Sequence, residues 1–248
     1  MTGVTGITGV LGGKALWYLT RGTGLVALVL LTASVLLGIL ELSQWATPRW
    51  PRFVTAGLHK NISLLVTAFL GAHIVTSVLD SFAPIGWLDA VLPFTSDYRP
   101  IWLGLGALAG DLLIALIITS LVRQRLGYRS WRAVHWFAYA SWPVALVHGL
   151  GTGSDVRTPW VLGLTGVCAA LVLGAVWWRI AAGWPAQRGI RTAAVVTSVV
   201  VPLAVTIWLL LGPMRPGWAG RAGTPTKLLS NQSLPALPLA ASGPEVTT

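Results

Sequence analysis

The hydrophobic pattern of the chain consists of uncharged apolar runs of about 20 residues, separated by short segments rich in charge, glycine or proline. A helix of that length crosses the hydrocarbon core of a bilayer. The pattern therefore predicts an all-α integral membrane protein with a six-helix transmembrane bundle. We expect its helices at residues 23–43, 54–79, 101–122, 133–152, 159–180 and 192–212.

The segments outside these runs predict the remaining organisation. Residues 1–22 are expected to be an N-terminal segment. Because residues 1–13 are uncharged and lack a basic n-region, the first helix is not expected to be a cleaved signal peptide. Residues 81–98 are too short and too broken by proline to cross the membrane, and are expected to lie across the outer surface as a lid. Residues 214–248 are rich in Pro, Ala, Gly and Ser and predict a flexible tail. The membrane domain is thus expected at 23–213.

The charge distribution predicts the orientation. The formal net charge is +10, and the loops after the first, third and fifth expected helices carry nine Lys and Arg, against two in the alternate loops. Short loops rich in Lys and Arg stay in the cytoplasm. Both termini are therefore expected outside, and the positive charge indicates topology rather than binding to nucleic acid.

All four histidines of the chain lie in two of the expected helices. His59 and His73 are fourteen residues apart in the second helix, and His135 and His148 are thirteen apart in the fourth. Each pair spans about 20 Å along its helix, less than the roughly 30 Å of hydrocarbon. Both helices run outward, so His59 and His135 (the inner pair) share one depth, and His73 and His148 (the outer pair) share another. Ionisable residues at such depths usually mark a site.

Two neutral imidazoles that face each other can supply both axial ligands of a haem iron. Two such levels predict two stacked haems between the second and fourth helices, which would let electrons cross the bilayer in two hops. A helix turns by about 100° per residue, so two side chains fourteen residues apart point to within about 40° of the same face. Two side chains thirteen residues apart differ in direction by about 140°. We expect an overwound stretch near Pro143 to bring His135 and His148 to one face. The alternative for each histidine is a hydrogen bond to neighbouring backbone without a ligand role; a zinc or copper site would need further Cys or carboxylate partners.

The motif H-x13-H on one helix and H-x12-H two helices later, with YRSWRAVHWFAY and HGLGTGSD around the second pair, resembles bacterial members of a known family. This is the ferric reductase-like transmembrane domain family, which includes the membrane cores of NADPH oxidases, ferric reductases and the haem subunit of the periplasmic methionine sulfoxide reductase system. The resemblance covers about residues 20–180. It implies two haem b, the inner held by His59 and His135 and the outer by His73 and His148, in a multi-pass protein of the bacterial plasma membrane.

The departures from the family shape the expected partners. No glycine-rich dinucleotide fingerprint follows a strand, so this oxidoreductase component is expected to lack its own FAD and NADPH domain. Its donor is then a separate flavoprotein reductase or a quinol, and its acceptor outside is ferric iron or a partner redox protein. Ser77 stands where the NADPH oxidases place a further histidine, so the resemblance does not carry oxygen reduction to this chain.

Other charged residues are candidates for contact with the cofactor. Asp111 is a carboxylate at mid-membrane depth; it either bonds a ligand imidazole or a haem edge, or is protonated and bonded to a carbonyl. Arginines at the two levels would suit haem propionates, or serve topology alone: Arg52 and Arg132 at the inner level, and Arg21, Arg99 and Arg157 at the outer level.

The leading hypothesis is therefore a di-haem b protein that passes electrons from a cytoplasmic or quinol donor to an extracytoplasmic acceptor. One alternative is the cytochrome b subunit of a quinone-linked respiratory complex, for which a spacing of fourteen on both helices is expected. Another is a proton-coupled transporter that uses its intramembrane histidines as a relay.

Overall fold

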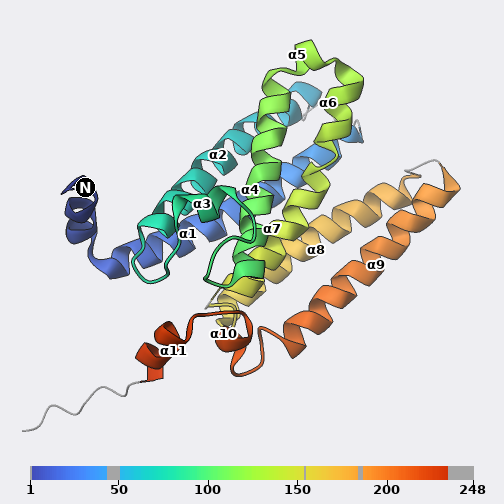
Figure 1. Ribbon diagram of the computed structural model, residues 1–248. Coiled ribbons are helices and arrows are strands. Elements are labelled where there is room, and N and C mark those ends of the chain that lie inside the picture. The colour runs from blue at the N-terminus through green and yellow to red at the C-terminus, as the bar shows by residue number, and fades with distance from the viewer. Residues whose placement is uncertain (1, 44–50, 154, 184–186, 234–248) are drawn as a thin grey trace, which may run out of the picture.

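The computed structural model describes residues 2–43, 51–153, 155–183 and 187–233. Those residues form α-helices joined by turns and contain no strand, which confirms the all-α prediction (Figure 1). The helices are α1 Thr2–Leu42, α2 Arg52–Leu79, α3 Trp87–Val91, α4 Pro100–Leu121, α5 Arg123–Leu126, α6 Tyr128–His135, α7 Ala138–Thr152, α8 Pro159–Ala181, α9 Arg188–Leu211, α10 Trp218–Arg221 and α11 Thr226–Ser233.

Among the described residues, five helices are each long and apolar enough to cross a membrane: Ala15–Leu42 of α1, and the whole of α2, α4, α8 and α9. The fourth run expected from the sequence, 133–152, is not one helix. It is divided into α6 and α7 by a turn at Trp136 and Phe137. The chain is thus a multi-pass membrane protein, and the divided run holds the second pair of histidines.

Both ends of the expected domain differ from the prediction. Helix α1 starts at Thr2 rather than near residue 23, because no proline interrupts residues 2–42. The tail expected to be free from residue 214 instead packs on the bundle: the Arg99 N–H donates to the Gly223 carbonyl at 3.0 Å, and the Trp218 indole donates to the Gly151 carbonyl at 3.0 Å. Residues 234–248 of that prediction lie outside the described residues.

The helices pack around a core that α1 shares with its neighbours. Helix α2 runs antiparallel to α1 along most of its length, α4 packs on α7, and α1 also contacts α7 and α8 (Figure 1). Leu31, Val66, Trp142 and Cys168 belong to one buried cluster, and the Trp142 indole donates to Thr32 Oγ1 at 2.9 Å. Helix α9 lies on α8 at the edge of the bundle and has no fully buried residue, although Val205, Trp208 and Leu209 pack against the core. Much of its apolar surface is thus left for lipid.

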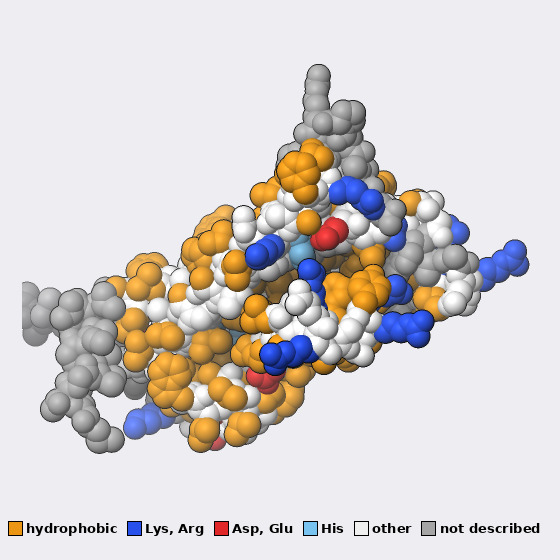
Figure 2. Space-filling view, turned by 90° about the horizontal axis from the view of Figure 1, so that it is seen from above, with side chains coloured by type: hydrophobic (Ala, Val, Ile, Leu, Met, Phe, Trp, Pro, Cys, Tyr) orange, Lys and Arg blue, Asp and Glu red, His pale blue; other side chains and the backbone are white. Residues whose placement is uncertain are grey.

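One end of the bundle carries basic side chains with few acidic ones. Arg123, Arg125 and Arg129, in and around α5, are exposed, and Figure 2, which looks onto this end, shows many Lys and Arg side chains with few acidic ones between them. The opposite end carries the lid-like segment around α3, which packs on α4. The two ends therefore differ in charge as the sequence predicted, with the inner pair nearer the basic one.

Candidate functional site

The four histidines form two facing pairs, matched as their depths predicted. The ring centroids of His59 and His135 are 6.4 Å apart and their planes are 78° from parallel. The rings of His73 and His148 are also 6.4 Å apart, with an angle of 76°. Two sites of nearly identical geometry are therefore built at two levels of one bundle.

The turn between α6 and α7 brings His135 and His148 to the same side. Three hydrogen bonds of the i→i+3 type lie at this turn: from the Phe137 N–H to the Val134 carbonyl at 2.9 Å, from Tyr139 to Trp136 at 3.1 Å and from Ala140 to Phe137 at 3.0 Å. Such bonds wind the chain by about 120° per residue instead of about 100°. The turn therefore adds rotation in the direction that the spacing of thirteen requires, and it lies just before Pro143, which cannot donate to the carbonyl four residues earlier.

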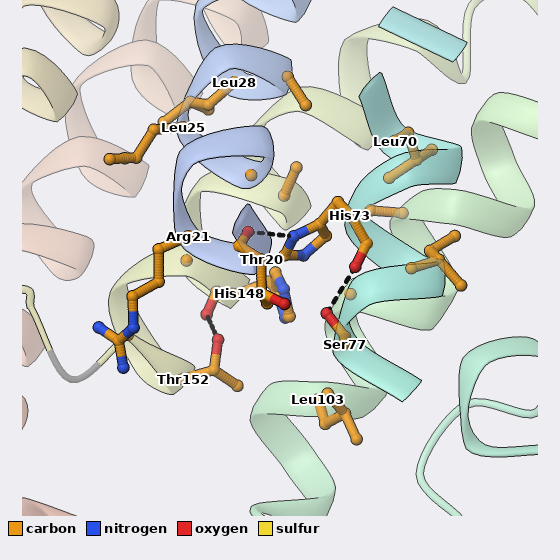
Figure 3. Close-up of a pocket in the computed structure, with 18 of the residues that line it drawn as sticks. Thr20, Arg21, Leu25, Leu28, Leu70, His73, Ser77, Leu103, His148 and Thr152 are labelled. Carbon is orange, nitrogen blue, oxygen red and sulfur yellow. Dashed lines mark hydrogen bonds between the residues drawn. The ribbon is translucent and has the colours of Figure 1, made fainter. Parts of the chain in front are cut away.

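Three of the four rings are held by a main-chain carbonyl of a neighbouring helix. The Nδ1–H groups donate from His59 to Ser34 at 3.0 Å, from His73 to Thr20 at 2.8 Å and from His148 to Trp102 at 2.8 Å (Figure 3 shows the His73 bond). Because a carbonyl oxygen can only accept, the proton lies on Nδ1 and Nε2 keeps its lone pair. Metal-binding histidines are oriented in this way.

A glycine one helical turn after each of these carbonyls makes room for the ring. A Cβ at Gly38 would lie 3.5 Å from the His59 ring and one at Gly24 would lie 3.0 Å from the His73 ring. One at Gly106 would lie 2.5 Å from His148 Nδ1, closer than any side chain tolerates. The glycines thus let each imidazole approach the backbone closely enough to bond it.

His135 is held differently from the other three. Its Nδ1 is buried and has no hydrogen-bond partner among the described residues. The ring instead stacks on Trp131, with centroids 4.9 Å apart and planes 26° from parallel, and the Trp131 indole donates to Ser120 Oγ at 3.3 Å. Stacking leaves this ring more freedom to turn in its own plane than a hydrogen bond would.

The geometry of both pairs fits a metal held between two imidazoles. Two metal–nitrogen bonds of about 2.1 Å and two distances of about 1.1 Å from nitrogen to ring centre give about 6.4 Å between centroids. No group of three or more His, Cys, Asp or Glu side chains in the described part of the chain could hold a metal ion. The pairs therefore suit an ion that brings its remaining ligands with it, as haem iron does.

A cavity of about 300 Å³ surrounds the outer pair (Figure 3). It lies between α1, α2, α4 and α7, and Phe82 and Ile85 of the segment before α3 close part of its rim. Arg21 lies at this rim, as predicted, where it forms an ion pair with Asp155 and covers the ring of Trp17 at 3.8 Å. The walls are largely apolar, as a porphyrin requires, and the charged lining residues are Arg21, Asp80, Asp89 and Asp155.

The other candidates receive less support from the structure. Arg52 and Arg132 lie near the inner pair in sequence, but both are exposed and make no hydrogen bond or ion pair with the described residues. Asp111 does not line the cavity, although its neighbours Gly110 and Leu113 do, and its carboxylate has no hydrogen bond in the described part. Their contact with a cofactor stays a prediction.

Sequence reasoning missed the residues that seat the rings. Thr20 and Ser34, and likewise Gly24 and Gly38, are fourteen residues apart, which is the spacing of the two histidines on α2. Because α1 and α2 pack antiparallel, the same spacing on both helices could have indicated that these residues of α1 face the two histidines of α2. The carbonyl of Trp102 and the stacking by Trp131 have no comparable signal, because each serves a single ring.

Comparison with known proteins agrees with the geometry. The family model of the ferric reductase-like transmembrane component matches residues 23–146, half of the chain, which include three of the four histidines and end just before His148. No significant match was found among curated proteins or among solved structures. With its paired histidines between apolar helices and this match, the chain belongs to the ferric reductase-like transmembrane component family.

Proposed function

We propose that the chain is a di-haem b protein that transfers electrons across the bacterial plasma membrane. The family indicates transmembrane electron transfer, and the two histidine pairs support two cofactors. The observation that carries the proposal is the pair geometry: 6.4 Å between centroids at both levels, with the Nε2 lone pair left free where Nδ1 is anchored. Bound haem supplies one-electron chemistry, tuned by its axial ligands and its burial.

The residues of each level have distinct tasks. His73 and His148 are oriented by carbonyls on α1 and α4, so both outer ligands are held before any cofactor binds. At the inner level one ligand, His59, is anchored in this way. The apolar walls exclude water, which raises the cost of charging the imidazoles and favours the neutral form that binds iron.

The donor and the acceptor are assigned to opposite ends. The positive-inside rule places the basic end around α5 in the cytoplasm, where an acidic flavoprotein reductase would dock or a quinol would enter from the bilayer beside His59 and His135. The acceptor, ferric iron or a partner redox protein, would then approach from the end that carries the outer pair. Residues of the segment around α3 line its cavity there.

The alternatives are less well supported. A proton relay needs hydrogen bonds that continue from one histidine to the next, whereas three Nδ1 protons are donated to main-chain carbonyls and no hydrogen bond joins two histidines in the described residues. A cytochrome b subunit of a quinone-linked complex would also pair histidines on two helices. The family match favours the ferric reductase-like assignment.

A reduced-minus-oxidised visible spectrum, with haem quantification on the purified full chain, tests the proposal. We expect two low-spin haem b per chain. His73→Ala and His148→Ala should each remove the same haem, and His59→Ala and His135→Ala should each remove the other. One haem or none in well-folded protein would overturn the proposal, and loss of a single haem from both His59→Ala and His73→Ala would overturn the pairing.

A further inference from the structure

A second cavity, of about 230 Å³, lies beside the cavity of the outer pair and beneath the segment that follows α9. Its wall combines the guanidinium groups of Arg99 and Arg157 with the aromatic rings of Phe82, Tyr98 and Trp218. The two cavities share Phe82 and Tyr98 in their linings. Whatever occupies the second cavity therefore lies next to the outer site.

Arg99 is a buried cation without an anionic partner. Its side chain is 5% exposed, and no carboxylate forms an ion pair with it in the described residues. Its Nε donates to Thr224 Oγ1 at 2.9 Å and its Nη1 to the Thr152 carbonyl at 2.8 Å, whereas Nη2 makes no hydrogen bond there. A buried charge is costly unless an opposite charge compensates it, so the site favours an anion.

The surroundings of Arg99 add positive charge rather than compensating it. Arg157, at the mouth of the cavity, is bonded to the carbonyls of Pro213 and Met214, which do not neutralise it. Among the described residues no acidic side chain lines the cavity: Asp97 is exposed, and Asp155 is paired with Arg21. Burial lowers the pKa of Arg99, and the charge of Arg21 acts in the same direction, partly opposed by Tyr98.

The backbone holds Arg99 in this position at an energetic cost. Its φ of 46° and ψ of 58° lie in the left-handed region, which a residue with a side chain rarely adopts. The bond from its N–H to the Gly223 carbonyl, at 3.0 Å, fixes this conformation. Strained residues that are held by their surroundings are concentrated at binding sites.

We propose that this cavity is a binding site for a small organic carboxylate. A guanidinium offers a planar pair of N–H donors that matches a carboxylate, and the aromatic walls suit a short carbon chain. The volume lies below the usual range of about 300–1,000 Å³ for drug-sized ligands, so the occupant is small. Because Arg157 and Gly217 are exposed, the cavity opens to solvent and the ligand enters from outside the bundle.

Isothermal titration of the haem-loaded full chain in neutral detergent with succinate tests this proposal. We expect saturable binding at low ionic strength, and no heat with 1,4-butanediol, which has the same carbon chain without charge. Arg157→Gln removes one cation, and Ala219→Leu adds volume inside the cavity while both arginines are kept. Each should weaken binding by about tenfold to a hundredfold.

Arg221→Gln is the matched control, because Arg221 lies in the same segment but does not line the cavity. The affinity of the Arg221→Gln variant for succinate should equal that of the wild type. Absence of binding to the wild type, or equal binding by Arg157→Gln and Ala219→Leu, would overturn the site. Binding to haem-free protein alone would assign the cavity to a haem carboxylate and would also overturn it. None of these outcomes depends on electron transfer, so failure here leaves the proposed function standing.

Discussion

Replacing Gly106 with alanine tests whether the close seat of His148 is needed for the outer site. A Cβ at this position would lie 2.5 Å from His148 Nδ1, whereas ordinary contact begins at 3.4 Å. The ring must therefore move by about 0.9 Å, the difference between these distances, which exceeds the tolerance of about 0.5 Å within which a site keeps its geometry. The same movement would break the 2.8 Å bond to the Trp102 carbonyl.

Two other glycines give a graded comparison by the same substitution. At Gly24 the Cβ would lie 3.0 Å from His73, a shortfall of about 0.4 Å from 3.4 Å, and at Gly38 it would lie 3.5 Å from His59, with no shortfall. Alanine gains about 1 kcal/mol of helix propensity in each case, against an overpacking cost of about 1–3 kcal/mol where contacts are too close. The fold should therefore survive in all of them, while only the outer site at Gly106 is displaced.

The assay is haem per chain, with the reduced-minus-oxidised spectrum of each purified variant. We expect Gly106→Ala to retain one haem, Gly24→Ala to retain two with an altered outer spectrum, and Gly38→Ala to match the wild type. Gly71→Ala on α2 is the control, because its Cβ would meet nothing within 4 Å and Gly71 does not line the cavity of the outer pair. Two unaltered haems in Gly106→Ala, or equal losses in Gly106→Ala and Gly38→Ala, would refute the reasoning.

Three further substitutions test other parts of the structure. Pro143→Ala restores a backbone donor, so the turn between α6 and α7 should relax and His135 should turn away from its partner. Haem quantification should show loss of the inner haem, and unchanged content would mean that the turn does not depend on the proline. Trp131→Leu removes the ring that stacks on His135, so electron paramagnetic resonance should show altered g-values for the inner haem alone, and identical spectra would contradict this support. Thr224→Val removes the acceptor of the hydrogen bond from Arg99 Nε and should lower the free energy of unfolding by about 1–3 kcal/mol. The measurement is a lower Tm at unchanged haem content. An unchanged Tm would show that the bond contributes little.

The pairing of the histidines followed from the sequence because the rise per residue of a helix is nearly fixed. Fourteen and thirteen residues then translate into depth, and depth alone matches His59 with His135 and His73 with His148. The direction in which His148 points relative to His135 does not follow in the same way, since one residue more or less changes it by about 100°. Only the structure locates the turn at Trp136 and Phe137, with its i→i+3 hydrogen bonds, before Pro143 rather than at it.

The segment after α9 shows a different limit of sequence reasoning. Glycine and proline are typical of flexible chain, but they also build tight turns. Gly217 and Gly223 have φ angles of 74° and 90°, and these turns fold the segment back so that Thr224 meets Arg99. Composition does not distinguish the two outcomes, because the difference depends on a long-range partner.

The hydrogen bonds that orient three of the histidines have a consequence for how such proteins diverge. Their acceptors are main-chain oxygens of Thr20, Ser34 and Trp102, and every amino acid carries that oxygen. The acceptor at Thr20 and at Trp102 would therefore survive a change of side chain, provided that the glycine one turn later is kept. Ser34 differs, because its Oγ also lies 3.4 Å from His59 Nδ1. At the outer pair, the orientation of both ligands is thus specified by the path of the backbone rather than by the identity of a side chain.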